Sequence, residues 1–269
     1  MPHLFSPLEL GPITLPNRIA VAPMCQYSAE DGTATDWHLQ HLMQFAISRA
    51  GLVMLEATGV NRTGRISQRC LGIYSDANEA GIARVVAAAR GVAAPGTRFG
   101  IQIAHAGRKA STHLPWQGGK PLAPGEGAWQ TVAPSPVPFF EGGPPPAALD
   151  EAGLAEVKAA FCQAAERATR AGLEVIELHA AHGYLLHEFV SPLSNHRTDQ
   201  YGGSLENRMR FPLEIFKAVR AAWPKDKPIS TRLSSVDWVE GGTTIDDAIA
   251  IARMLHEAGN DILAVSSGG

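Results

Sequence analysis

Short apolar runs alternate with longer amphipathic runs along almost the whole 269-residue chain. The apolar runs have the length of strands, and the longer runs repeat apolar residues at helical spacing. Strands that alternate with helices form a parallel sheet covered by helices. The expected strands are 19–22, 52–56, 99–104, 173–178, 229–233 and 262–265, and the expected helices are 36–49, 77–91, 150–171, 205–223 and 244–259.

Two kinds of fold satisfy this alternation, an open doubly wound sheet and a (β/α)8 TIM barrel. No GxGxxG motif follows any of the strands, which disfavours a dinucleotide-binding Rossmann domain. Polar residues follow several different strands, as in barrels, where the site is built from many strand ends. We therefore expect a single TIM-barrel domain over residues 1–269. About six β/α units are present, and the last two of the eight are lacking.

Residues 105–149 interrupt the alternation after the third expected strand. The segment is rich in glycine and proline and includes Pro144, Pro145 and Pro146. A connection of this length in a compact domain usually has a function, such as a lid over an active site. We expect 105–149 to be a long loop or lid.

Charge and cysteine content exclude several classes of protein. The net charge is −3 and no long basic run occurs, so nothing indicates a nucleic-acid partner. No apolar run approaches the roughly 20 residues that span a bilayer, so no membrane partner is expected. The amino-terminal residues lack both a basic start and a long apolar core, so we expect no secretory signal. The three cysteines are Cys25, Cys70 and Cys162, and they are widely spaced in the sequence. Scattered cysteines are typical of proteins in reducing compartments, so we expect a cytoplasmic location.

The segment 179–208 is the densest concentration of chemically useful side chains. We expect His179 and His182 to lie just beyond the end of strand 173–178, followed by the phenol of Tyr184. In α/β folds the loops at the carboxyl ends of the strands converge on one crevice. Two imidazoles and a phenol there suit the binding of an oxyanion and the delivery of a proton. The segment predicts an enzyme.

Four motifs resemble those of the Old Yellow Enzyme family: the segments 22–27, 102–109, 179–184 and 201–208. The pair Cys25 and Tyr27 is similar to the branch of that family represented by bacterial xenobiotic reductase A and YqjM. The resemblance implies an FMN-dependent ene-reductase on a TIM barrel. Such an enzyme uses NADPH or NADH to reduce the C=C bond of α,β-unsaturated carbonyl or nitro compounds.

The resemblance also implies the roles of the substrate-binding residues. His179 and His182 would donate hydrogen bonds to the substrate oxygen, and Tyr184 would be the proton donor. Tyr27 would be a second phenol in contact with the substrate. The alternative for each is structural, namely a histidine at a strand end or an aromatic ring in a loop.

The flavin would be held by residues from several strands. Gln102 offers a donor and an acceptor that match the amide edge of the flavin pyrimidine. Arg232 places a cation in an apolar run, where it needs an anionic partner such as the reduced flavin, or else a structural salt bridge. Cys25 would lie beside the ring and is not expected to be a nucleophile. The remaining expected flavin contacts are Ala22, Pro23, Met24 and Ala57.

Four further residues of these motifs are expected to brace loops by ion pairs rather than to bind substrate: Arg108, Asp199, Tyr201 and Arg208.

Two rival functions remain open. A metal-dependent TIM-barrel hydrolase or aldolase could use His179, His182 and another histidine as ligands. However, no carboxylate sits at a strand end to complete a zinc site, and the only near candidates, Glu56 and Glu177, lie within strands. We therefore expect no metal. The second rival is an inactive or weakly flavin-binding fragment, because six strands leave two exposed sheet edges. The complete protein is expected to be a homodimer or homotetramer by analogy only.

Overall fold

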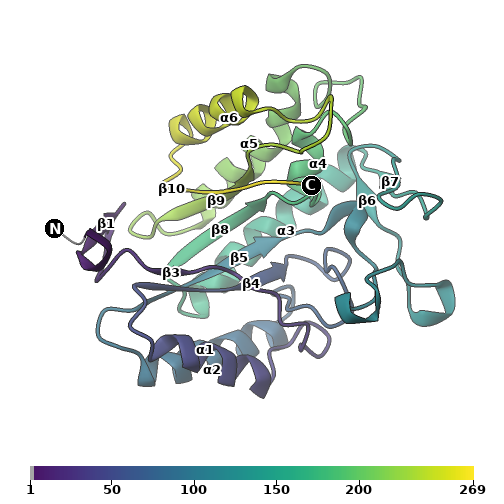
Figure 1. Cartoon of the computed structure of the whole chain (residues 1–269). Coiled ribbons are helices and arrows are strands. Elements are labelled where there is room, and N and C mark those ends of the chain that lie inside the picture. The colour runs from purple at the N-terminus through teal and green to yellow at the C-terminus, as the bar shows by residue number, and fades with distance from the viewer. Residues whose placement is uncertain (1–2) are drawn as a thin grey trace.

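A computed structural model describes residues 3–269, and its centre is one sheet of six parallel strands (Figure 1). The strand order is β10-β9-β8-β5-β4-β3. The six strands therefore lie in the sheet in the same order as in the sequence. The order is that of the expected barrel, and the described residues form an open arc of six strands. The strands are β3 (Ala20–Val21), β4 (Leu52–Gly59), β5 (Arg98–Ala104), β8 (Val175–Ala180), β9 (Ile229–Ser234) and β10 (Ile262–Ser266).

All five expected helices are present, and side chains cap the start of at least two of them. Asp150 accepts a hydrogen bond from the Gly153 amide at 2.8 Å, and Thr244 forms a capping box with Asp247. A short helix α4 follows β8 and was not predicted. The helices are α1 (Asp36–Ala46), α2 (Asp76–Val92), α3 (Glu151–Arg170), α4 (Leu185–Val190), α5 (Leu205–Ala222) and α6 (Ile245–Glu257).

Successive residues of each strand point to opposite faces of the sheet. In β8, Ile176 and Leu178 join the main hydrophobic core beneath the helices. We call this the helix-covered face. Val175 and Glu177 line a cavity of about 160 Å³ on the opposite side, which we call the open face.

A hairpin of β1 (Leu8–Leu10) and β2 (Ile13–Leu15) packs against the amino ends of the strands on the open face. Leu15 forms a small apolar cluster there with Leu52, Met54 and Val175. Figure 1 shows β1 at one end of the sheet, while β6 and β7 lie beyond the other end. The hairpin closes the amino ends, so the polar residues of the open face gather near the carboxyl ends.

Each of the six strands differs from its predicted bounds by one to three residues, and two of the changes involve predicted site residues. Strand β8 extends to Ala180, so the prediction that His179 lies beyond the strand is wrong. The strand continues because His179 and Ala180 pair in register with Arg232 and Leu233 of β9. Strand β4 continues to Gly59 through a shift of register between Leu55 and Ala57, which places Ala57 inside the strand.

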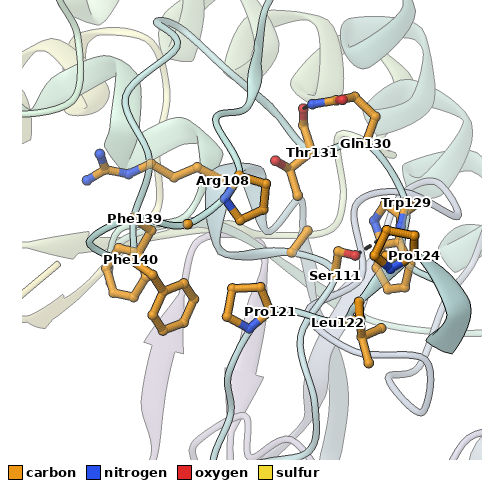
Figure 2. A pocket seen from close by; sticks show the side chains of 15 residues that line it. Arg108, Ser111, Pro121, Leu122, Pro124, Trp129, Gln130, Thr131, Phe139 and Phe140 are labelled. Atoms are coloured by element: carbon orange, nitrogen blue, oxygen red, sulfur yellow. Dashed lines mark hydrogen bonds between the residues drawn. The ribbon is translucent and has the colours of Figure 1, made fainter.

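The segment 105–149, predicted as a long loop or lid, contains short elements. They satisfy backbone hydrogen bonds that an irregular segment of this length would leave unpaired. The segment surrounds a cavity of about 560 Å³, with Phe139 and Phe140 on one side and Trp129 on the other (Figure 2). The elements are the 3-10 turns η2 (Gly107–Lys109), η3 (Pro115–Gln117) and η4 (Pro124–Glu126) and the paired strands β6 (Val132–Ala133) and β7 (Ala147–Ala148).

Candidate active site

The two predicted histidines and the predicted proton donor form one cluster at the carboxyl end of β8. The ring of His182 lies against that of His179, with His182 Nδ1 at 3.3 Å from His179 Nε2. The Tyr184 ring stands edge-on to His179, and their centroids are 4.7 Å apart. One strand end therefore presents two imidazoles and a phenol to the same small volume.

The turn that carries His182 has an unusual backbone. His182 has φ of 59° and Gly183 has φ of 71°, both in the left-handed region. Lys109 of η2 donates a hydrogen bond to the His182 carbonyl at 2.7 Å, and the Gly183 amide donates to His187 Nδ1 at 2.8 Å. These contacts compensate for the strain and fix the direction of the His182 ring.

A buried contact between His187 and Asp237 anchors this turn to the loop after β9. His187 Nε2 lies 2.9 Å from Asp237 Oδ1, and the Ser191 hydroxyl and Thr243 amide donate to the other Asp237 oxygen at 2.7 and 2.8 Å. Burial opposes ionisation of Asp237, but the hydrogen bonds from His187, Ser191 and Thr243 together bring its pKa below the ordinary value. The carboxylate is a fixed anchor.

Both site histidines are neutral at physiological pH. Burial, helped by the neighbouring His182 and Arg232, holds the pKa of His179 well below its usual value. Burial and the charge of Arg232 lower the pKa of His182 to about 4. A neutral imidazole carries one N–H donor and one acceptor, so each ring can donate a single hydrogen bond to a substrate.

The two site tyrosines are protonated. Burial, followed by the proximity of Cys25 and Tyr27, raises the pKa of Tyr184 far above its ordinary value. Burial raises the pKa of Tyr27 in the same way, and its ring stands edge-on to Trp116 of η3 at 5.8 Å. Each phenol can therefore donate a proton or a hydrogen bond at neutral pH.

The predicted flavin ligands Gln102 and Arg232 lie on the open face of β5 and β9. Gln102 donates a hydrogen bond to Glu177 at 2.8 Å, and Ser230 donates to the other Glu177 oxygen at 2.8 Å. Burial raises the pKa of Glu177. Among residues 3–269, the buried Nε of Arg232 has no hydrogen-bond partner and Arg232 forms no ion pair. An unpaired cation beside a fixed amide fits the electron-rich pyrimidine edge of a reduced flavin.

The remaining predicted flavin-binding residues lie in β4 and in the segment that follows β3. Ala22 and Pro23 follow β3 and line the open-face cavity, and Ala57 is buried in β4. Met24 is 43% exposed. Burial and then Glu56 raise the pKa of the Cys25 thiol well above its usual value, so a thiolate nucleophile is not formed.

The residues expected to brace loops do so, but only Asp199 forms the predicted ion pair. Asp199 pairs with Arg197, and Tyr201 donates to Glu214 at 3.4 Å. Arg208, however, donates to backbone carbonyls, at 2.7 Å to that of Val190, rather than forming an ion pair. The carbonyls at the end of α4 need donors, and a guanidinium supplies several.

Arg108 also has a different role from the predicted ion pair. Its side chain donates to the Val137 carbonyl at 3.3 Å and lies over the Phe139 ring at 5.7 Å. Its backbone amide donates to Glu188 at 2.8 Å. Arg108 thus connects η2 to the 105–149 segment and to α4.

Sequence reasoning missed three participants, Lys109, the His187–Asp237 pair and Ser266. Ser266 Oγ lies 2.6 Å from His182 Nε2. Lys109 and His187 belong to the motifs already noted, but only their contacts with the 182–183 backbone reveal what they do. Ser266 is separated from His182 by 84 positions, and its sole signal was a place at the end of a strand.

Two features of the described residues bear on other functions. Within residues 3–269, no group of three or more histidine, cysteine, aspartate or glutamate side chains is arranged to hold a metal ion. None of the helices in the same range combines the length and apolar character needed to cross a membrane.

Comparison with known proteins agrees with this geometry. Residues 3–269 match the NADH:flavin oxidoreductase / NADH oxidase family. The NADPH dehydrogenase of Bacillus velezensis is 45% identical over 98% of this chain and 73% of its own length. Morphinone reductase superposes with a TM-score of 0.81 at 34% identity, covering 98% of this chain and 71% of that structure. The Old Yellow Enzyme homologue of Zymomonas mobilis gives 0.83 at 29% identity, over 100% and 74%.

The fold and the family match define the class of protein as a flavin oxidoreductase built on the TIM-barrel architecture. More particularly, the chain belongs to the NADH:flavin oxidoreductase / NADH oxidase family and is of the Old Yellow Enzyme type. It is an FMN-dependent ene-reductase that uses a reduced nicotinamide nucleotide.

Proposed function

We propose that the cluster at the end of β8 binds the oxygen of an electrophilic alkene and protonates its α-carbon. Substrates of this class are α,β-unsaturated aldehydes and ketones, maleimides and nitroalkenes. The observation that carries the proposal is the convergence of His179 Nε2 and His182 Nδ1, 3.3 Å apart, beside the Tyr184 ring. A substrate oxygen placed against both nitrogens can accept from both rings.

When bound, FMN supplies the hydride that adds to the β-carbon of the alkene. Negative charge then moves to the carbonyl or nitro oxygen, where N–H groups of His179 and His182 stabilise it. Because both rings are neutral, they donate hydrogen bonds without surrendering a proton. Tyr184, whose phenol is protonated, delivers the proton to the α-carbon as general acid. Tyr27 contacts the other side of the substrate.

We assign the flavin ring to the surface formed by Gln102 and Arg232. The amide of Gln102 would pair with the pyrimidine edge, and Arg232 would stabilise negative charge on the reduced ring. The backbone of 22–25 and the small side chain of Ala57 would permit close approach. NADPH or NADH would supply the electrons at the same site before the alkene enters.

We assign a lid function to the segment 105–149. Trp116 of this segment packs against Tyr27, and Phe139 lies 4.5 Å from the ammonium group of Lys109, which itself lies 5.4 Å from the Tyr184 ring. The segment therefore reaches both proposed substrate tyrosines. A cover of this kind excludes water from the developing charge.

A second candidate is a chain of the same family that binds FMN only weakly. The observation in its favour is that β3 and β10 each pair on one side only within residues 3–269. Open edges expose unpaired backbone groups and part of the barrel interior to solvent.

For the working enzyme we propose a homodimer or homotetramer in the cytoplasm with a small-molecule substrate.

The test is alkene reduction by the purified protein with FMN, NADPH and 2-cyclohexenone under anaerobic conditions. We expect cyclohexanone, with one NADPH oxidised per product molecule. His179→Ala should lower product formation by about 100-fold, the typical effect of removing one oxyanion donor. Oxidation of NADPH without any saturated product from cyclohexenone, a maleimide or a nitroalkene would contradict the proposal.

A further inference from the structure

Most buried histidines of this protein have a tautomer fixed by the backbone. Each of them accepts a backbone N–H at Nδ1, over distances from 2.8 to 3.3 Å. A nitrogen that accepts a hydrogen bond has a free lone pair, so a neutral ring must carry its proton on Nε2. The histidines held in this way are His38, His105, His179 and His187.

His182 is the exception, because in residues 3–269 neither of its ring nitrogens accepts a backbone N–H. Nδ1 faces His179 Nε2 at 3.3 Å, and Nε2 faces the Ser266 hydroxyl at 2.6 Å. A hydroxyl can donate or accept, so the direction of the hydrogen bond to Ser266 decides which His182 nitrogen carries the proton.

The two directions correspond to two states of the site. Without substrate, His179 Nε2–H donates to His182 Nδ1, and His182 Nε2–H donates to Ser266. When a substrate oxygen takes the place between the rings, two N–H groups are needed there. His182 must then carry its proton on Nδ1, and its Nε2 must accept from the Ser266 hydroxyl.

We propose that Ser266 is a positioning residue that lets His182 change tautomer, so that both histidines donate to the substrate oxygen. This inference rests on the proposed function of the histidine pair. It also explains why the pair works without a net charge. The Ser266 hydroxyl rotates, Nε2 of His182 gives its proton to solvent and Nδ1 takes one from solvent, so Nδ1 changes from an acceptor to a donor and the ring stays neutral.

The surroundings hold Ser266 in place for this role. Ser266 pairs with Ser234 in the register of β10 and β9, and the backbone and side chain of Ser235 both donate to the Ser266 carbonyl, at 2.8 and 2.9 Å. The Ser234 hydroxyl accepts the His182 amide at 2.9 Å and donates to the Gly268 carbonyl at 2.6 Å. The hydroxyl and the imidazole are therefore fixed to the same two strand ends.

The test is nitrogen-15 NMR of the histidine rings in the FMN-loaded protein, with and without saturating cyclohexanone. The ketone is an unreactive probe that supplies only the oxygen. We expect His182 to be the Nε2–H tautomer alone and the Nδ1–H tautomer with the ketone. In Ser266→Ala the change should be lost and the ketone should bind about tenfold more weakly, equivalent to one hydrogen bond of about 1.4 kcal/mol.

Two control variants separate this role from a structural one. Ser266→Thr keeps the hydroxyl and should restore both the tautomer change and the affinity. Ser267→Ala makes the same substitution at the exposed neighbouring residue and should behave as the wild type. The inference fails if Ser266→Ala still changes tautomer, or if wild-type His182 keeps one tautomer throughout. A tautomer change in a protein that reduces no alkene would overturn the proposed function alone.

Discussion

The two faces of the central sheet are built from alternate residues of the same strands, and they differ in almost every property. On the helix-covered face, Ile176, Leu178 and their neighbours pack against fully buried rings such as Phe161 and Phe216. On the open face, the intervening positions of β8 and β9 are Glu177, His179, Ser230 and Arg232. A shift of one residue in register would exchange the two sets.

Within a single strand, the residues that stabilise the fold alternate with the residues proposed for chemistry. The helix-covered face gains free energy from apolar burial. The open face buries polar groups, and these are costly unless they are paired. Glu177 is paired twice, whereas the buried Nε of Arg232 has no hydrogen-bond partner among residues 3–269. This unpaired group supports the proposal that a ligand binds on the open face.

The largest expected effect is on stability, at the helix-covered face. Phe216→Ala removes a ring with no exposed surface and should lower the free energy of unfolding by about 3–5 kcal/mol. Ser230→Ala, on the open face, loses one hydrogen bond to Glu177 and should cost about 1 kcal/mol. Urea denaturation of the apoprotein measures both. An equal loss of unfolding free energy in the two variants would contradict the distinction between the two faces.

The next effect is on catalysis. Tyr184→Phe removes the proposed general acid and should slow proton delivery, and with it alkene reduction, by about 100-fold. Stopped-flow measurement with excess 2-cyclohexenone gives the rate. Tyr201→Phe is the matched control, since that phenol contacts Glu214 away from the cluster. An unchanged rate in Tyr184→Phe would mean that solvent supplies the proton.

A smaller effect is expected on cofactor affinity. Arg232→Met keeps an unbranched apolar stem but removes the unpaired cation. It should weaken FMN binding by about 10- to 100-fold, the effect of losing a charged hydrogen bond. Quenching of FMN fluorescence measures the Kd. Arg84→Met, at an exposed ion pair with Asp36, should leave it unchanged. If both variants bind FMN with the same Kd, the proposal that Arg232 contacts the pyrimidine edge of the flavin is wrong.

The smallest effect concerns pH. Burial lowers the pKa of His105 to about 4, so the folded protein disfavours the charged ring that the unfolded chain accepts below about pH 6.5. Stability contributed by neutral His105 is therefore present above pH 6.5 and is lost as the pH falls towards 4. In His105→Asn, the free energy of unfolding measured with urea should fall less between pH 7 and 5 than it does in the wild type. A decline as steep as that of the wild type would contradict this.

The sequence predicted the sheet and helices well because their apolar periodicity is local. It also predicted Gln102, His179 and Arg232 on or just after strands that lie side by side in the sheet. It did not predict the β1–β2 hairpin, the turns within 105–149 or the extension of β8 through His179, because tertiary pairing decides these. Ser266 and the His187–Asp237 pair could not be foreseen, since their partners lie 84 and 50 positions away and leave no periodic signal.

The central claim is that His179 and His182 stabilise charge on the substrate oxygen. The most direct measurement compares the two half-reactions of the variant His179→Ala/His182→Ala by anaerobic stopped-flow. We predict that reduction of FMN by NADPH changes by less than about tenfold, while reoxidation by 2-cyclohexenone slows by at least about 1,000-fold. Equal slowing of both half-reactions would contradict the account.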